Sequence, residues 1–195
     1  MRLFIALDID DIIRDRIARF LEGVRGFAPD ARWIRPEALH VTLKFIGERP
    51  EEGVEAIHHA LSNVEAGPLA MTFRGYGFFP GAQAARVFWL GIDSGPELVF
   101  LARAVDQAMA ALGIPKEDHA FSPHLTLARG GHGSGSPQRQ QDDRPNLRFG
   151  KLREKLATMS TPGFGTMTAR EFCLYKSQLL RGGSRYTKIA SFSLP

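Results

Sequence analysis

The stretch "FSPHLTLARG" at residues 121–130 decides how the rest of the chain is interpreted, because it combines a β-strand pattern with an embedded histidine. Side chains on a strand point alternately to its two faces. Leu125 and Leu127 therefore share one face, and His124 and Thr126 share the other. The leucines are suited to a core, so the opposite face presents an imidazole and a hydroxyl together.

The stretch "LHVTLKFIGE" at residues 39–48 repeats this pattern. His40 and Thr42 share one face of the predicted strand, whereas Val41 and Leu43 share the other. The two histidines are 84 residues apart, and each belongs to a strand–helix–strand pattern, which indicates an internal duplication. We therefore expect two lobes that share one cleft.

The paired histidines and threonines are suited to chemistry at a phosphodiester. Two residues on a strand are spaced by about 6.6 Å, so both side chains can contact one phosphate group. Imidazole titrates near pH ~6.5, so one ring can hold a proton while the other lacks it. Acid–base cleavage of a P–O bond requires that combination and no metal. A lone histidine on a strand is more often structural, but two matching pairs are hard to attribute to chance.

The composition is that of an ordinary globular protein, with 195 residues, 44% of them hydrophobic and 24% charged. No apolar run reaches the ~20 residues that cross a bilayer, and the N-terminal "MRLFIALDIDD" has a strand pattern rather than a signal-peptide pattern. The single cysteine, Cys173, excludes an internal disulfide and a Cys-rich metal site, and its apolar neighbours predict a buried strand position. We expect a cytoplasmic monomer with no membrane partner, which suits this cysteine usage.

The charge is unevenly distributed along the chain. Residues 1–128 hold 13 Lys and Arg against 17 Asp and Glu, a net charge of −4, whereas residues 129–195 hold 12 against 4, a net charge of +8. The basic C-terminal third permits a polyanionic partner without requiring one.

Hydrophobic periodicity predicts helices and strands in mixed order, within a single domain over residues 1–195. This order favours an α+β fold with mainly antiparallel sheets. The apolar stripe of the third helix comprises Leu98, Leu101, Val105, Met109 and Leu112. Helices are expected at residues 10–26, 50–67, 96–113 and 150–159, and strands at 2–9, around the two His-x-Thr stretches, and at 69–79, 85–92, 166–176 and 186–194.

With these motifs in place, the chain resembles the 2H phosphoesterase superfamily, and more closely the RNA 2′,3′-cyclic phosphodiesterases, historically called 2′-5′ RNA ligases. The blocks "RLFIALDI", "RWIRPEALHVTLKFIGE", "GYGFFP", "RVFWLGI", "FSPHLTLAR" and "FCLYKSQLLRGGSRYTKIASFSL" follow the family order over nearly the whole chain. The resemblance implies a bilobal fold with pseudo-two-fold symmetry, in which two mainly antiparallel sheets surround a central cleft and the helices lie outside.

The resemblance also implies a reaction and roles for the paired residues. The family opens a 2′,3′-cyclic phosphate at an RNA end and leaves a 2′-phosphate, without a metal or a cofactor. His40 would be the general acid that protonates the leaving 3′ oxygen, and His124 the general base that deprotonates water. Thr42 and Thr126 would donate hydrogen bonds to the non-bridging oxygens, whose charge grows in the transition state.

Four further side chains are candidate substrate-binding residues. The resemblance favours a phosphate contact for Arg129, although strict alternation places it on the face opposite Thr126. Tyr186 and Arg86 occupy family-like positions that either line the groove or serve ordinary packing. Phe45 follows the first pair and either stacks on a base or packs in the core.

Several alternatives remain open from the sequence. The substrate is an RNA end, such as a tRNA fragment, or a small cyclic nucleotide. The reverse chemistry would join RNA ends through a 2′-5′ linkage without ATP. A non-catalytic RNA-binding module would use the basic C-terminal third and would not need both His-x-Thr pairs. The Gly- and Ser-rich loop at residues 130–146 is interpreted as a flap or insert that admits an RNA end to the groove.

Overall fold

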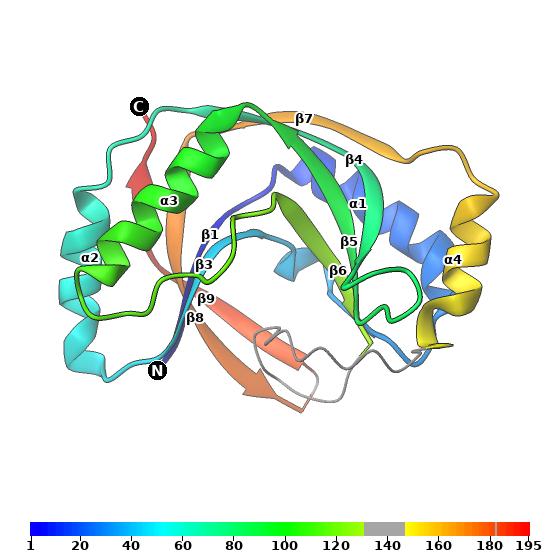
Figure 1. The fold of residues 1–195 in the computed structure, drawn as a ribbon, viewed down its shortest axis with the longest axis horizontal. Helices are drawn as coiled ribbons and strands as arrows, with labels where there is room; N and C mark the ends of the chain where they lie inside the picture. The colour runs from blue at the N-terminus through cyan, green and yellow to red at the C-terminus, as the bar shows by residue number, and fades with distance from the viewer. Residues whose placement is uncertain (131–146, 182) are drawn as a thin grey trace.

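The computed structural model describes residues 1–130, 147–181 and 183–195, which form two antiparallel sheets with helices on their outer sides (Figure 1). This arrangement confirms the predicted α+β class with mainly antiparallel sheets. The first sheet has the strand order β3 (Val41–Glu48), β1 (Arg2–Leu7), β8 (Glu171–Leu180), β9 (Gly183–Ser193). The second has the order β2 (Arg32–Trp33), β6 (His124–Arg129), β5 (Val87–Ser94), β4 (Leu69–Phe79), β7 (Gly163–Ala169).

The helices connect the two sheets. The α-helices are α1 (Asp11–Val24), α2 (Val54–Ser62), α3 (Pro96–Ala110) and α4 (Gly150–Ala157), and the 3₁₀ turns are η1 (Arg25–Phe27), η2 (Pro36–Ala38), η3 (Glu51–Gly53) and η4 (Leu147–Phe149). Helix α1 follows β1 of the first sheet but packs against β7 of the second, whereas α3 follows β5 of the second sheet and packs against β3 of the first. Figure 1 shows α2 and α3 on one side of the molecule and α1 and α4 on the other. Among the residues that the structure describes, no helix is long and apolar enough to span a bilayer.

The apolar stripes of the helices form much of the core. Four of the five residues predicted for the stripe of α3 are buried, but Leu112 is 41% exposed. The prediction for Leu112 was wrong because the helix ends at Ala110 and the chain then turns through Gly113, whose φ of +75° suits a glycine. The buried members are Leu98, Leu101, Val105 and Met109, and in α1 they are Ile13, Ile17, Leu21 and Val24.

The strand predicted at residues 166–176 is in fact two strands in different sheets. Strand β7 pairs with β4 in the second sheet, and β8 pairs with β1 and β9 in the first. The crossover lies at Arg170, whose carbonyl accepts a hydrogen bond of 2.7 Å from the Leu194 amide. Strand β8 places Cys173 in the core, which confirms its predicted burial.

A buried ammonium ties β3 to the segment that leads into β6. Lys44 is 2% exposed, and its Nζ donates to Asp106 Oδ1 at 2.6 Å and to the Pro115 carbonyl at 2.9 Å. Glu117 Oε1 lies 3.3 Å from the same Nζ. Asp106 lies on α3. The Lys44 ammonium therefore links β3, which follows the first histidine, to α3 and to the segment that precedes the second His-x-Thr pair.

Candidate active site

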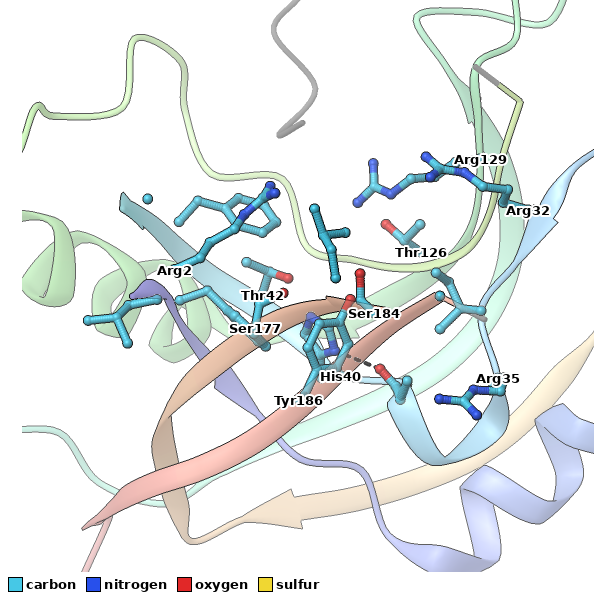
Figure 2. A pocket seen from close by; sticks show the side chains of 18 of the residues that line it. Arg2, Arg32, Arg35, His40, Thr42, Thr126, Arg129, Ser177, Ser184 and Tyr186 are labelled. Carbon is cyan, nitrogen blue, oxygen red and sulfur yellow. Dashed lines mark hydrogen bonds between the residues drawn. The ribbon is translucent and has the colours of Figure 1, made fainter. Parts of the chain in front are cut away.

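The two His-x-Thr pairs line one cavity of about 430 Å³ between the sheets (Figure 2). This volume lies within the range of roughly 300–1,000 Å³ that is usual for ligand sites. His40 precedes β3 and Thr42 lies on it, whereas His124 and Thr126 lie on β6. The structure therefore brings together, in one cleft, the four residues that the sequence places in two distant stretches.

Each imidazole is oriented by the same local device. His40 Nδ1 lies 2.7 Å from the carbonyl oxygen of Ala38, and His124 Nδ1 lies 2.7 Å from that of Ser122. Because a carbonyl only accepts, each Nδ1 must carry the hydrogen. The Nε2 of each neutral ring is then left as the nitrogen that can bind a ligand or exchange a proton.

Helix α1 holds the turn that carries the carbonyl that orients His40. The Arg14 guanidinium donates through Nη1 to the Pro36 carbonyl at 2.6 Å and to the Leu39 carbonyl at 3.3 Å, and through Nη2 to the Ile9 carbonyl at 3.1 Å. These bonds fix the 3₁₀ turn η2, which ends at Ala38. No sequence pattern pointed to Arg14, because it lies on a helix far from the motif.

A β-bulge in each cleft strand explains which later residues reach the cleft. Lys44 pairs with Ile5 and Thr42 with Ala6, so Leu43 is an extra residue on β3. The register of β6 skips Leu127 in the same way, since its neighbours pair with Phe88 and Trp89. A bulge reverses the alternation of side chains beyond it.

Because of the bulges, the residue five positions after each histidine also faces the cleft. Phe45 follows His40 by five residues, Arg129 follows His124 by five, and both line the cavity. The expectation from strict alternation, that Arg129 faces away from Thr126, was wrong because of the bulge. The two halves thus supply equivalent His and Thr residues but different fifth residues, one aromatic and one cationic.

Burial dominates the electrostatics of both histidines. It lowers the pKa of His40 to about 4, with the Ala38 carbonyl and Asp8 acting to raise it and Arg129 acting to lower it further. Burial also lowers the pKa of His124, against the effect of its Ser122 hydrogen bond, and Arg129 adds to the lowering. Both rings are therefore neutral at pH 7 without a ligand. A bound phosphate anion would favour their protonated forms.

Arginines supply most of the charge around the cavity, and the cavity is lined by Arg2, Arg32, Arg35 and Arg129. Burial lowers the pKa of Arg129; the Tyr186 hydroxyl acts to raise it, and the charges of Arg32 and Arg2 act to lower it. Among the described lining residues Glu48 is the one carboxylate, and it lies 3.3 Å from the Met1 ammonium. The cleft is therefore suited to an anion. Of these four arginines, only Arg129 was predicted from the sequence.

The remaining predicted binding residues differ in position. Tyr186 lines the cavity, and its ring lies edge-on to His40. Arg86 is not among the lining residues, so the expectation that it lines the groove is not supported. Arg86 lies just before β5, and Val87, the first residue of that strand, is the one that pairs with Arg129. Residues 131–146 of the predicted flap lie outside the described residues.

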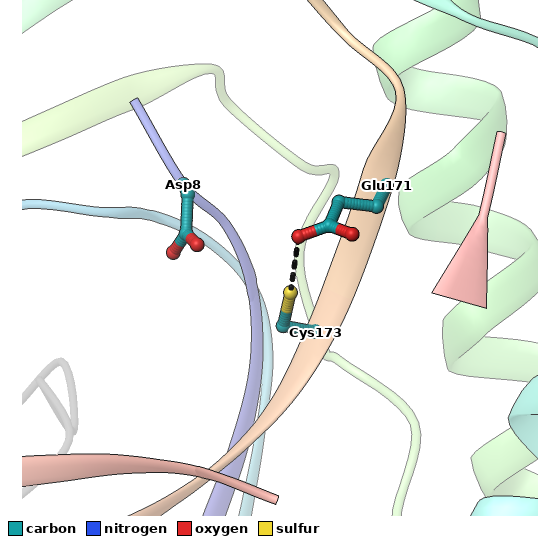
Figure 3. Close-up of side chains that lie close together, drawn as sticks. All are labelled: Asp8, Glu171 and Cys173. Carbon is teal, nitrogen blue, oxygen red and sulfur yellow. Dashed lines mark hydrogen bonds between the residues drawn. The ribbon is translucent and has the colours of Figure 1, made fainter. Parts of the chain in front are cut away.

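A second group of ligand-type side chains is not among the residues that line the cleft: Asp8, Glu171 and Cys173 have ligand atoms within 4.8 Å of one another (Figure 3). The Lys188 ammonium lies 2.7 Å from Asp8 Oδ2 and 3.2 Å from Glu171 Oε1. Burial acts to raise the pKa of Asp8, but hydrogen bonds from Lys188 and Tyr175 outweigh it and lower that pKa. Lys188 thus supplies the positive charge that these carboxylates need, and the group forms an ion-pair network.

Comparison with known proteins places this geometry among phosphoesterases. The family model for LigT like Phosphoesterase matches residues 7–89 and again residues 90–186, so each match contains one His-x-Thr pair. An RNA 2′,3′-cyclic phosphodiesterase of Archaeoglobus fulgidus is 34% identical over 192 residues, covering 98% of this chain and 99% of the relative. The Thermus thermophilus protein of the same name is 32% identical over 204 residues, covering 100% and 90%.

The fold of a solved relative agrees with these matches. The crystal structure of E. coli LigT complexed with 3′-AMP superimposes with a TM-score of 0.76 at 26% sequence identity. The alignment covers 99% of this chain and 97% of that one. The similarity therefore extends over both sheets and is not confined to one half of the molecule.

Proposed function

This chain belongs to the LigT-like phosphoesterase family, and on that basis we propose that it hydrolyses 2′,3′-cyclic phosphate ends of RNA to 2′-phosphomonoesters. The observation that carries the proposal is the convergence of His40, Thr42, His124 and Thr126 on one cationic cavity. Relatives that carry this activity in their names match nearly the full length of the chain. The 3′-AMP complex of E. coli LigT adds that a relative binds a nucleotide with a terminal phosphate.

The reaction requires one proton to be removed and one to be supplied. His124 takes a proton from water through Nε2 as the water oxygen bonds to phosphorus. His40, protonated once the substrate anion is bound, gives its proton to the 3′ oxygen as the bond between that oxygen and phosphorus breaks. The assignment of His40 as the acid follows the family resemblance; Asp8 favours the protonated ring, whereas burial and Arg129 oppose it.

Other cleft residues stabilise the charge that develops at phosphorus. Thr42 and Thr126 donate hydrogen bonds to the two non-bridging oxygens. Arg129 adds a guanidinium to the same anion, which is consistent with its desolvated position among other arginines. Phe45 offers a ring face for the terminal base. The two imidazoles carry both proton transfers, so the scheme has no step that needs a metal.

An oligonucleotide that ends in a 2′,3′-cyclic phosphate tests the proposal in the presence of a chelator. The expected product carries a 2′-phosphate, which chromatography against 2′- and 3′-phosphate standards identifies. A 3′-phosphate product would contradict the assigned leaving group, and loss of activity with the chelator would contradict metal independence. If the protein only binds RNA, the cyclic end will stay intact and changing both pairs will leave affinity unaltered.

The same assay examines ligation. Adding an oligonucleotide with a free 5′-hydroxyl offers an attacking group in place of water. Attack of this hydroxyl on the cyclic phosphate would break the same bond to the 3′ oxygen and form a 2′-5′ linkage, without ATP, when both RNA ends are held. A longer product would show this ligation.

A further inference from the structure

The cavity continues beyond the two histidines along the first sheet. The Phe4 ring packs against His40, with centroids 4.8 Å apart. Arg2 lies two residues before Phe4 on β1, which corresponds to about 7 Å along a strand. It pairs with Glu48 on one side and with Ser177 on the other, at the end of the sheet away from His40. Arg2 and Ser177 both line the cavity, so the cavity is longer than the His-x-Thr site.

The far end of the cavity is bounded by the hairpin of β8 and β9. In its register Ser177 pairs with Tyr186 and Leu179 pairs with Ser184, and all four residues line the cavity. Figure 2 shows Arg2 and Arg129 toward opposite ends of the cavity, with Thr42 and Ser184 between them. The hairpin therefore places the Ser177 hydroxyl beside a guanidinium that is distinct from Arg129, and a second hydroxyl, that of Ser184, nearer the middle of the cavity.

Leu179 gives this end an apolar surface. Its side chain is 56% exposed although it lines the cavity, while the neighbouring Leu180 is 54% exposed and does not line it. A leucine at the lip of a cavity can cover the face of a base or a ribose and remove it from water. Hydroxyls, a guanidinium and an apolar side chain are together the groups that contact a nucleotide.

The charge of the cleft also exceeds what one cyclic phosphate requires. The phosphodiester of a 2′,3′-cyclic mononucleotide carries one negative charge, whereas four arginines line the cavity. The Glu48 carboxylate lies against the Met1 ammonium and is 75% exposed. Each further nucleotide in a strand adds one phosphate, so a strand matches this charge better than a mononucleotide does.

We infer that Arg2, Ser177, Leu179 and Ser184 form a subsite for the nucleotide that precedes the cyclic end. Arg2 binds the phosphate between the last two nucleotides, the serines hydrogen-bond this nucleotide, and Leu179 packs on its base or ribose. The enzyme then prefers the end of an RNA strand to a free cyclic nucleotide. This inference rests on the proposed function, and it names the substrate class.

Two substrates separate the subsite from the catalytic centre: a 2′,3′-cyclic mononucleotide and a five-nucleotide RNA with the same terminal base and cyclic end. The measured quantity is the ratio of kcat/KM for the strand to kcat/KM for the mononucleotide. We expect a ratio well above one in the unaltered protein. Arg2→Gln should lower the ratio about tenfold, through loss of a hydrogen bond to a charged group. Leu179→Ser should lower it about threefold, and the matched variant Leu180→Ser should leave it unchanged.

The salt dependence gives a second readout for Arg2. Loss of one contact to a single-strand phosphate reduces the slope of log KM against log salt concentration by about 0.7. Arg2→Gln should show this change with the strand, whereas Leu179→Ser and the surface variant Arg103→Gln should not. Equal kcat/KM for the two substrates, or an unaltered ratio in Arg2→Gln, would overturn the subsite alone. If neither substrate is opened, the proposed function fails and the subsite fails with it.

Discussion

The ring of Tyr186 stands edge-on to the ring of His40, with centroids 5.1 Å apart and planes at 89°. Phe4 completes the enclosure, because it packs against both rings and stacks on Tyr175. His124 has a similar setting, with Phe79 edge-on at 5.2 Å. Aromatic packing and a backbone hydrogen bond thus hold each imidazole in one orientation.

Substitution of Tyr186 tests whether this packing matters for catalysis. Tyr186→Phe keeps the ring and should leave kcat for a cyclic-ended oligonucleotide within about threefold. Tyr186→Ala frees the His40 ring and should lower kcat by about 10- to 100-fold, the cost of small misplacements in an active site. If Tyr186→Phe is as damaging as Tyr186→Ala, the hydroxyl and not the ring is the important feature. Urea midpoints of both variants serve as the folding control.

The lowered pKa of His40 predicts a loss of stability in acid. The unfolded chain takes up this proton near pH ~6.5, whereas the folded protein takes it up only near pH 4. Stability present above pH ~6.5 is therefore lost as the pH falls toward 4, by up to about 3 kcal/mol from this residue. His40→Gln should lose less stability than the unaltered protein between pH 7 and 4.5, as measured by urea unfolding. The exposed His59→Gln is the control, and equal losses in all three proteins would refute the attribution.

Removing Asp106 should lower the stability of the protein more than removing the charge of Lys44. Asp106→Ala leaves a buried ammonium short of its closest carboxylate and should cost about 3 kcal/mol of unfolding free energy. Lys44→Met removes the buried charge and leaves Asp106 and Glu117, whose side chains are 20% and 54% exposed and reach water, so it should cost less than Asp106→Ala. In the Lys44→Met background, Asp106→Ala should cost much less than it does alone. A large loss from Lys44→Met would show that the ion pair itself is strongly stabilising.

Arg129 should influence the pH dependence as well as binding. Its positive charge lowers the pKa of both histidines, so its removal raises both. In Arg129→Gln the acidic limb of kcat/KM against pH, which reports deprotonation of the base, should move to higher pH. Arg129→Lys keeps the positive charge, so the acidic limb should stay at the same pH. Its KM should rise, since a lysine lacks the two-pronged guanidinium. A limb that stays in place in Arg129→Gln would contradict this coupling.

The sequence predicted the parts of the site that depend on local pattern. His40, Thr42, His124 and Thr126 share a two-residue spacing that survives in the structure, and their duplication indicated one cleft. The α+β class followed from the mixed order of helical and strand periodicities. The roles of these four residues stay predictions.

What the sequence did not predict depends on partners across the sheets. The bulge at Leu127 is defined by the register of β6 against β5, and it alone brings Arg129 into the cleft. The break at Arg170 separates two strands only because their partners lie in different sheets. Arg2 is the first residue of an apolar strand, and nothing in the neighbouring residues shows that this end of the strand lies at the cleft. These features arise from tertiary pairing, which no local pattern contains.

The most direct test of the account is the single-turnover rate at which an oligonucleotide's 2′,3′-cyclic end is opened by His40→Ala and by His124→Ala. Because each imidazole carries one of the two proton transfers at the same phosphorus, we expect each variant to lose a factor of about 10² or more while remaining folded. Full activity in either variant would show that only one histidine, or neither, acts at the phosphorus.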